Sequence, residues 1–391
     1  MTTLRGLTWD HTRGWAPLAA TSQVFRDHRP DVRVDWDRES LWAFGEGGLT
    51  HAAQVYDLII VDHPMVGVMA ESGLFRPFPA RPRAAAVGLS APSYHLDGHQ
   101  WALPVDAACQ VSVFRPDLLA HAGRGCPDTW DAVLELAATT GKVAMPLTPI
   151  DVLSSLITLC GGTGGGSGPA HGAFLPRRAA LEALGLLRRL RDLMPGWCVD
   201  RNPIAVLETM SSSADVWYCP LLFGYTNYSR RGYARHQVRF GDIPRRGGPG
   251  LAAGALLGGA GIAVTAGGQD PRLAAEYAEW VASSDVQRGP YLQAGGQPAA
   301  AAAWSDPDAD RLTGGFFSAT RATIDRAVLR PRHSSYPRFQ TDVAVLLHTW
   351  LTGPVTTAEG VLDHIDAAYR ASTTTGSPTA ALASPTVRSI A

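Results

Sequence analysis

Two aspartate–histidine pairs stand out in this chain of 391 residues as groups that could do chemistry. Asp10 and His11 follow the segment TTLRGLTW, and Asp62 and His63 follow the apolar run YDLIIV. A carboxylate beside an imidazole can bind a polar ligand, and it can also move a proton in general acid–base catalysis. We therefore expect either two unrelated surface turns or two pairs that face one cavity.

The sequence lacks the usual catalytic and metal-binding motifs. No serine stands in a GxSxG pattern, and no HExxH occurs. Neighbouring residues of an extended chain point in different directions, so the two pairs do not suit a zinc site. The glycine-rich stretch 161–169 lacks the Lys-Ser/Thr of a phosphate loop, and we interpret it as a surface loop. We expect no metal and no cofactor.

Composition narrows the class of protein further. Apolar residues make up 46% and charged residues 18%, which is typical of a folded globular chain. The net charge of −1 argues against nucleic acid as a partner. No run approaches the roughly 20 apolar residues of a membrane segment. The five cysteines are scattered without a CxxC pattern, so we expect buried thiols in a reducing compartment.

The order of predicted elements indicates an α/β fold. Residues 2–9, 32–37 and 56–64 read as strands, and 14–30 and 64–73 read as helices between and after them. This β-α-β-α-β order favours parallel strands with right-handed crossovers. Further strands are expected at 100–106, 109–115, 142–149, 238–244 and 258–268, and further helices at 127–141, 152–160, 177–194 and 271–289.

Read together, these segments resemble a known family. The motifs that carry the resemblance are YDLIIVDHP, QWALPVDAACQVSVFRPDLL, PDTWDAVLELA, GGAGIAVTA, AAEYAEWVASSDVQ and GGQPAAAAAW, in this order. The chain is similar over roughly residues 2–370 to the bacterial extracellular solute-binding proteins of the sugar type, which serve ABC importers. Its first residues show no basic segment and no apolar run of a signal peptide, whereas that family is exported.

The resemblance implies a two-lobed, periplasmic-binding-protein-like α/β fold with a ligand cleft between the lobes. It divides the chain into lobe one, residues 1–108 plus 258–310, and lobe two, residues 109–257 plus 311–371. Residues 372–391 are expected to form a disordered tail. Ligands in open α/β sheets bind at the carboxyl ends of strands. Both Asp-His pairs follow such ends, so we expect them to face the same cleft and to make binding pH-dependent between about pH 5 and 8.

Other residues of the predicted cleft have structural alternatives. Asp106 is either a ligand contact or part of the hinge, and the tyrosines of WYCPLLFGYTNY line either the cleft or the core. Trp304 is either a stacking platform or lobe packing, and Arg332 is either a ligand contact or solvated. The complete set of expected ligand contacts is Trp9, Asp10, His11, Arg13, Asp62, His63, Asp106, Tyr218, Tyr225, Trp304, Arg332 and His333.

Three functions fit these observations. The first is a binding protein that closes on a small polar molecule and hands it to an ABC permease if it is exported. The second is a cytosolic enzyme on the same scaffold, a lyase, isomerase, cyclase or hydrolase, that uses Asp10, His11, Asp62 and His63 in acid–base chemistry. The third is a scaffolding partner. As written, the sequence predicts a cytoplasmic protein. A leader that had been removed would instead place it in the periplasm or outside the cell.

Overall fold

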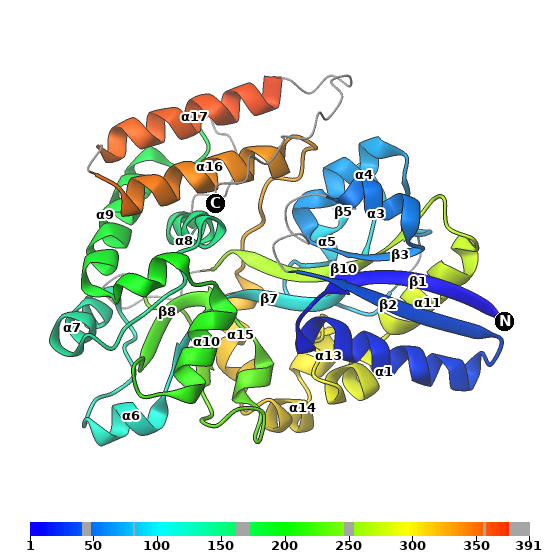
Figure 1. The fold of residues 1–391 in the computed structure, drawn as a ribbon, viewed down its shortest axis with the longest axis horizontal. Helices are drawn as coiled ribbons and strands as arrows, with labels where there is room; N and C mark the ends of the chain where they lie inside the picture. Colours follow the sequence, from blue (N-terminus) through cyan, green and yellow to red (C-terminus); the bar gives the residue numbers. More distant parts are fainter. Residues whose placement is uncertain (41–47, 81–82, 162–172, 246–253, 355–356, 375–391) are drawn as a thin grey trace, which may run out of the picture.

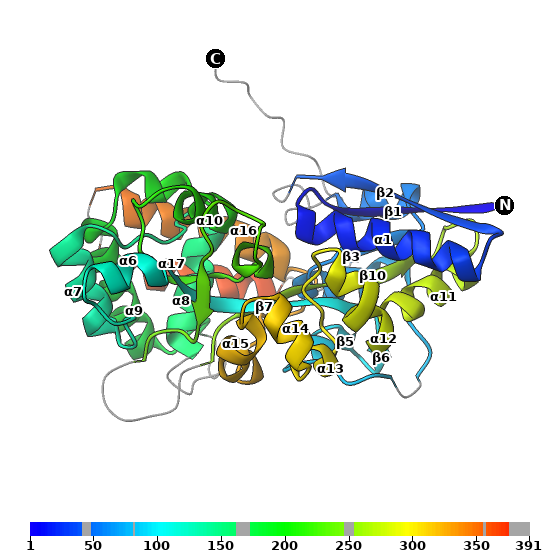
Figure 2. The ribbon, with the colours of Figure 1, turned by 90° about the horizontal axis from the view of Figure 1, so that it is seen from below.

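The computed structural model describes residues 1–40, 48–80, 83–161, 173–245, 254–354 and 357–374. Two α/β lobes lie side by side and are joined in the middle by long strands (Figures 1 and 2). This confirms the predicted fold class. The glycine-rich stretch after Gly161 and residues 375–391 of the expected tail lie outside the described residues.

One eight-stranded sheet runs through both lobes: six strands follow the order β2-β1-β3-β10-β7-β8, and β4 pairs with β10 and β9 with β7 beside this path. Strand β1 is parallel to β2 and β3, as the β-α-β-α-β pattern predicts, whereas β10 is antiparallel to both β3 and β7. The bounds are β1 Thr2–Trp9, β2 Val32–Glu39, β3 Leu58–Val61, β4 Phe75–Arg76, β7 Leu103–Phe114, β8 Tyr218–Phe223, β9 Arg239–Gly241 and β10 Leu257–Thr265.

Lobe one is a sheet covered on both faces. Phe25 and Tyr277 belong to the core on one face, and Met69 and Tyr94 to the core on the other. All of β3 is buried, which explains its unbroken apolar sequence. The remaining elements of this lobe are α1 Thr12–His28, α3 Leu49–Val55, η1 His63–Met65, α4 Val66–Ser72, α5 Ser90–Ser93, β5 His95–Leu96, β6 His99–Gln100, α11 Pro271–Val281, α12 Ser284–Val286 and η4 Gln287–Tyr291.

Lobe two surrounds β8 with helices. Thr129 caps α7 by accepting a hydrogen bond from the amide of Ala132. The elements are α6 Pro116–His121, α7 Trp130–Thr140, α8 Pro149–Gly161, α9 Arg177–Leu193, η2 Gly196–Asp200, α10 Pro203–Ser212, η3 Thr226–Ser229, α15 Phe316–Asp325, α16 Tyr336–Thr352 and α17 Ala358–Thr374. Between η4 of lobe one and α15, the chain forms α13 Ala301–Trp304 and α14 Pro307–Leu312. Helix α17 therefore covers the first residues of the expected tail.

Three segments pass between the lobes. Strands β7 and β10 pair with each other along most of their length. The third crossover segment is the stretch between α15 and α16, which contains Val328 and Arg330 (Figure 1). Val328 forms a bridge to Leu256 just before β10. The β7–β10 pairing shifts register between Ala260 and Gly261. Just before this shift, Gly259 has a φ of +99°, a conformation that residues with a Cβ rarely adopt.

Four of the five cysteines are buried, as expected, and Cys126 is exposed. The strand predicted at 142–149 is not formed, because only Val143 pairs, in a single bridge with Tyr218. Among the described residues, no helix is long and apolar enough to cross a lipid bilayer.

Candidate ligand-binding site

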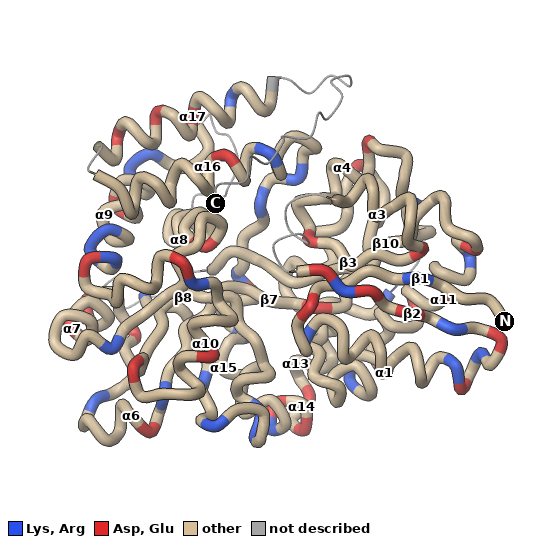
Figure 3. The backbone as a smooth tube through the Cα atoms, in the orientation of Figure 1, with Lys and Arg blue, Asp and Glu red and all other residues tan. Residues whose placement is uncertain are grey.

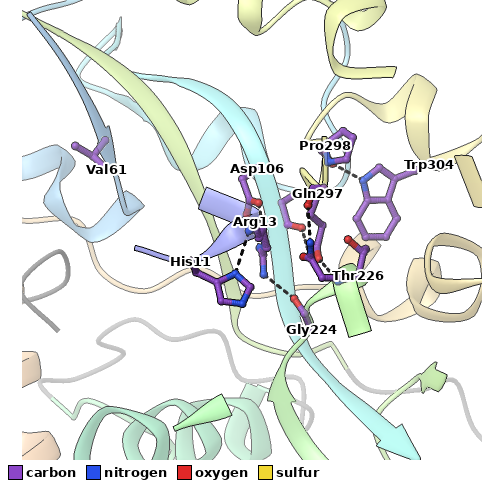
Figure 4. Close-up of polar contacts among 12 residues, drawn as sticks. His11, Arg13, Val61, Asp106, Gly224, Thr226, Gln297, Pro298 and Trp304 are labelled. Atoms are coloured by element: carbon purple, nitrogen blue, oxygen red, sulfur yellow. Dashed lines mark hydrogen bonds and ion pairs between the residues drawn. The ribbon is translucent and has the colours of Figure 1, made fainter. Parts of the chain in front are cut away.

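His11 stands at the carboxyl end of β1, where lobe one meets lobe two. It is the N-cap of α1, and its Nδ1 accepts a hydrogen bond of 3.0 Å from the amide of Arg13. Its ring lies 4.9 Å, centroid to centroid, from that of Tyr225 in an edge-on arrangement, and 6.4 Å from that of Tyr228. Residues separated by more than two hundred positions in the sequence therefore meet where the lobes join. Figure 4 shows His11 at this place together with Gly224, the residue before Tyr225.

Burial and the nearby Arg13 lower the pKa of His11 to about 4. The imidazole is therefore neutral at physiological pH, and its Nε2 carries the proton when Nδ1 accepts from the amide. A neutral imidazole offers one donor and one acceptor, which suits a hydroxyl better than it suits a charged group. The lowered pKa displaces the protonation of His11 from the range between pH 5 and 8 to lower pH.

Arg13, two residues after His11, is buried, and its guanidinium donates hydrogen bonds to Asp106 and Gly224. Its Nε donates to Asp106 over 2.7 Å, its Nη2 donates to the other oxygen of that carboxylate, and its Nη1 donates to the carbonyl of Gly224 over 2.7 Å (Figure 4). The guanidinium also lies over the ring of Tyr225, 4.5 Å from its centroid. Burial alone would lower the pKa of Arg13, but the Asp106 carboxylate raises it, so the guanidinium stays charged.

The segment after β8 is fastened to lobe one by further hydrogen bonds. The amide of Thr226 donates to Oε1 of Gln297 over 2.9 Å, and Nε2 of Gln297 donates to the carbonyl of Ala107 over 2.7 Å (Figure 4). Asn227 donates to the carbonyl of Gly295 over 3.2 Å. Tyr225 and its neighbours are therefore held at a fixed position against lobe one.

Asp10 contacts β2, whereas its neighbour His11 contacts Tyr225. Its carboxylate pairs with Arg38 of β2 at 3.2 Å, and its side chain is 58% exposed. Asp10 therefore lies at the edge of the His11 region and leaves room for a ligand to reach its oxygens.

The second pair, Asp62 and His63, accepts hydrogen bonds from Arg330 of the third crossover segment. Asp62 accepts a hydrogen bond of 2.6 Å from Nη2 of Arg330, and His63, fully buried, accepts a longer one from the amide of Arg330. Burial lowers the pKa of His63 to about 4, so this imidazole too is neutral. The Asp62 side chain keeps 27% of its surface exposed and is the member of the pair that a ligand can reach.

Four expected contacts, Tyr218, Trp304, Trp9 and Tyr225, belong to the hydrophobic cores, and of these Tyr225 is the one whose ring packs against that of His11. Tyr218 is fully buried in lobe two, where its hydroxyl donates to the carbonyl of Pro127. Trp304 donates to the carbonyl of Pro298 over 2.7 Å and packs against Phe317 at 4.9 Å (Figure 4). Trp9 is 5% exposed, and its ring leaves no space for a Cβ on Gly14. The packing alternative therefore holds for Tyr218 and Trp304.

Arg332 and His333 lie beyond the third crossover. Nη1 of Arg332 donates to the carbonyls of Pro92 and His95, at 2.8 and 2.7 Å, so this arginine satisfies the end of α5. The half-buried ring of His333 lies 5.9 Å from that of Tyr336. Neither residue touches His11 or Tyr225 in the contacts described above.

Sequence reasoning missed Asp151 in the first turn of α8. Its carboxyl is 3% exposed and accepts a hydrogen bond of 2.5 Å from the hydroxyl of Thr148. Burial raises the pKa of Asp151 to about 7, and its charge acts on the hydroxyl of Tyr225. The Thr-Pro-Ile-Asp spacing before an apolar run is typical of a helix start and was the available signal.

Other parts of the described chain offer no competing centre of this kind. Among the described residues, no group of three or more His, Cys, Asp or Glu side chains could hold a metal ion. Two cavities of about 300 and 330 Å³ share Arg83, Ala84, Leu103 and Ala282 in their walls, and neither is lined by a candidate residue.

Solved structures share this two-lobed architecture. Maltose-bound MalE3 of T. maritima matches with a TM-score of 0.76 and 18% identity, over 94% of this chain and 99% of that one. The GacH receptor of Streptomyces glaucescens, solved with acarbose, matches with a TM-score of 0.78 and 16% identity, over 95% and 98%. A ribitol-bound ABC transporter solute-binding protein from Agrobacterium radiobacter matches with a TM-score of 0.76 and 17% identity, over 95% and 98%.

Sequence comparison agrees with this likeness. No curated protein matches the chain significantly. The family model described as bacterial extracellular solute-binding protein matches residues 49–311, which is more than half of the chain and includes β3, β7, β8 and β10. The chain therefore belongs to the family of bacterial extracellular solute-binding proteins.

Proposed function

We propose that this protein binds a small, hydroxyl-rich molecule of the sugar or polyol class between its two lobes. The observation that carries the proposal is the meeting of His11 from lobe one with Tyr225 and Tyr228 from lobe two at the carboxyl end of β1. Similar proteins solved with maltose, ribitol and acarbose support the ligand class.

The chemistry of these side chains fits such a ligand. Tyrosine rings offer apolar faces together with a hydroxyl, and the neutral imidazole of His11 offers a donor and an acceptor. The exposed carboxylate of Asp10 and the partly exposed carboxylate of Asp62 can accept hydrogen bonds from ligand hydroxyls. We assign His11 and Tyr225 to the centre of the site and the two aspartates to its edges. Tyr228, which is 1% exposed and donates its hydroxyl to Glu208, packs behind His11 and supports it.

The division of the chain into lobes is part of the proposal. Lobe one comprises 1–108 plus 258–310, and lobe two comprises 109–257 plus 311–371. The register shift in β10 and the left-handed conformation of Gly259, next to Asp106, support a pivot at this place. Opening and closing about this pivot would admit and enclose the ligand.

The enzyme alternative has less support. A general base works best when its pKa is near the operating pH, whereas His11 and His63 have pKa values of about 4. His63 is also fully buried, and Asp10 is paired with Arg38. We therefore expect a bound sugar to be released unchanged.

We further propose that the protein acts outside the cytoplasm and delivers its ligand to an ABC permease. The family is extracellular, and this supports both statements. Fractionation of the source cells tests the location, because recovery of the full-length protein in the cytoplasm alone would contradict it.

Calorimetric titration with maltose, ribitol and acarbose tests the binding proposal. At least one of these probes should bind and should raise the melting temperature, because a ligand at about a hundred times its Kd adds about 2.7 kcal/mol of stability. His11→Ala and Tyr225→Ala should weaken binding about ten- to a hundredfold. His121→Ala, a change at the end of α6, is the control. Wild-type affinity in both site variants, or binding of none of the three probes, would refute the proposal.

A further inference from the structure

We propose that Arg13 is a positioning residue that fixes the relative orientation of the two lobes. Its effect on ligand affinity rests on the binding function proposed above, whereas its effect on lobe orientation does not. Arg13 would act on the arrangement of the site and would not contact the ligand, because its guanidinium donates to oxygens of the protein.

The first argument is that Arg13 is fully committed to the protein. All three nitrogen atoms of its guanidinium donate to protein oxygens, and the residue is 3% exposed. One face of the guanidinium is covered by the ring of Tyr225. The sequence suggested Arg13 as a ligand contact, but its donors are used within the protein, so its influence on a ligand must pass through other residues.

The second argument is that the partners of Arg13 belong to different parts of the molecule. Arg13 lies in the first turn of α1 in lobe one, Asp106 lies on the crossover strand β7, and Gly224 follows β8 of lobe two. One side chain therefore ties lobe one, the crossover and lobe two together (Figure 4). The same three parts would move relative to one another if the lobes rotated.

The third argument is the irregular geometry around Asp106. Gly259 approaches so closely that a Cβ would lie 2.4 Å from the carbonyl oxygen of Asp106. Ala260 pairs with Asp106 but the next residue, Gly261, pairs with Pro104, so the ladder skips a residue here. A sheet bends most easily at such a bulge, and a buried ion pair at the bend resists the motion because separating its charges is costly.

Arg13 also controls the placement of His11. The amide of Arg13 donates to Nδ1 of His11, and the guanidinium of Arg13 holds Gly224 and the ring of Tyr225 against which His11 packs. A change in lobe orientation would therefore separate the two sides of the proposed binding site at its centre.

Arg115 provides a matched control within one lobe. It is 2% exposed, donates through Nε and Nη2 to both oxygens of Asp117, and donates through Nη1 to the carbonyl of Met210. Arg115 therefore makes the same two-pronged contact with a carboxylate and the same bond to a carbonyl as Arg13, together with one more bond to the carbonyl of Ser213. The Asp117 side chain is 56% exposed, whereas that of Asp106 is 1% exposed. All of the partners of Arg115 belong to lobe two, however, so Arg115 has no interlobe role.

Interlobe distances measured between spin labels test the proposal without any ligand. Labels are attached to Gln23→Cys on α1 and Arg178→Cys on α9, both exposed positions, in a Cys126→Ser background. The remaining four cysteines are buried. The distance distribution is recorded for the parent protein and for Arg13→Gln, Arg13→Lys and Arg115→Gln, and thermal unfolding shows which of these fold.

The parent protein and Arg115→Gln should give the same narrow distribution, and Arg13→Gln should give a displaced or broadened one. Arg13→Lys keeps the charge but loses the two-pronged contact, so it should also change the distribution, and it decides the matter if Arg13→Gln does not fold. An unchanged distribution in a folded Arg13 variant would overturn the proposal. An equal change in Arg115→Gln would do the same.

A binding measurement then separates the two proposals. Whichever of maltose, ribitol and acarbose binds the parent protein should bind Arg13→Gln about tenfold more weakly or worse, and should bind Arg115→Gln normally. If none of the three probes binds the parent protein, the ligand proposal is in error, while the label distances still decide the role of Arg13. Normal sugar affinity in Arg13→Gln would contradict the positioning role.

Discussion

Nη2 of Arg330 lies 2.6 Å from the carboxylate of Asp62, although 268 positions separate the two residues. Asp62 follows β3 of lobe one, and Arg330 belongs to the third crossover segment, where its Nη1 also donates to Gln340 of α16. This pair links lobe one to the third crossover segment, as the Arg13–Asp106 pair links α1 to the crossover strand β7. Two arginine–aspartate pairs therefore connect lobe one to the segments that lead into lobe two.

Replacing Asp62 by alanine should destabilise the protein by about 3 kcal/mol, because it leaves the buried Arg330 without its counter-charge. The free energy of unfolding from urea titration is the measurement. Arg338→Gln is the control, since the Arg338–Asp342 pair is exposed and should contribute less than about 1 kcal/mol. Equal losses in the two variants would show that the Arg330–Asp62 pair has no special role in stability.

The distribution of charged residues along the chain does not by itself identify the ion pairs that connect the lobes. Acidic and basic residues are scattered over both lobes, and many lie on the outer helices (Figure 3). Most ion pairs, such as Arg178–Glu182, are largely exposed, whereas Arg13–Asp106 is almost completely buried. Burial therefore distinguishes the ion pairs that connect the lobes from the ion pairs that lie on the surface of one helix or strand.

Asp151 predicts a loss of stability on the alkaline side. Burial raises the pKa of Asp151 from 3.8 to about 7, so the folded state keeps the proton more tightly than the unfolded state. The corresponding stability is complete below about pH 4 and is lost as the pH rises toward 7 and above. Asp151→Asn should therefore be more stable than the wild type at pH 8 but not at pH 5. Melting temperatures at the two pH values test this.

The fold was predictable where local pattern decides it. Strand β1 occupies the predicted residues 2–9, and the apolar run LIIV of β3 is buried as expected. Thr129 and the helix it caps follow from local hydrogen-bonding chemistry. The strand predicted at residues 142–149 was wrong, although the apolar sequence suits a strand. Only Val143 has a pairing partner there, and the segment leads into the buried start of α8.

The candidate site was only partly predictable because its partners are distant in sequence. The position of His11 at a strand end follows from the local pattern, but its contact with Tyr225 depends on how β8 meets lobe one. Tyr218 and Tyr225 look alike in the sequence, and both are buried, with 0% and 6% of their surface exposed. Only the tertiary structure sets the second of them against Arg13, where the lobes meet. The shift in the pKa of His11 likewise arises from burial, which the sequence does not reveal.

His11 and His63 predict a loss of stability in acid. Both have their pKa lowered from 6.5 to about 4, mainly by burial, so the unfolded chain binds protons more readily than the folded one in this range. Stability should be complete above about pH 6.5 and should fall as the pH drops toward 4. His63→Gln should flatten this part of the curve, whereas substitution of the exposed His121 should not. An unaltered acid limb in His63→Gln would contradict the assignment.

Gly259→Ala should be strongly destabilising because two effects act together at the pivot. The φ of +99° disfavours any residue with a Cβ, and the new methyl group would lie 2.4 Å from the carbonyl oxygen of Asp106. Gly185→Ala is the opposite case, since Gly185 lies on the exposed face of α9 with open space around it. That variant should gain about 0.5–1 kcal/mol from helix propensity and from the reduced freedom of the unfolded chain. Urea titration of both variants should therefore give changes of opposite sign. If Gly259→Ala unfolds at the same urea concentration as the wild type, β7 and β10 do not pack as closely at Asp106 as the structure shows, and the pivot must lie elsewhere.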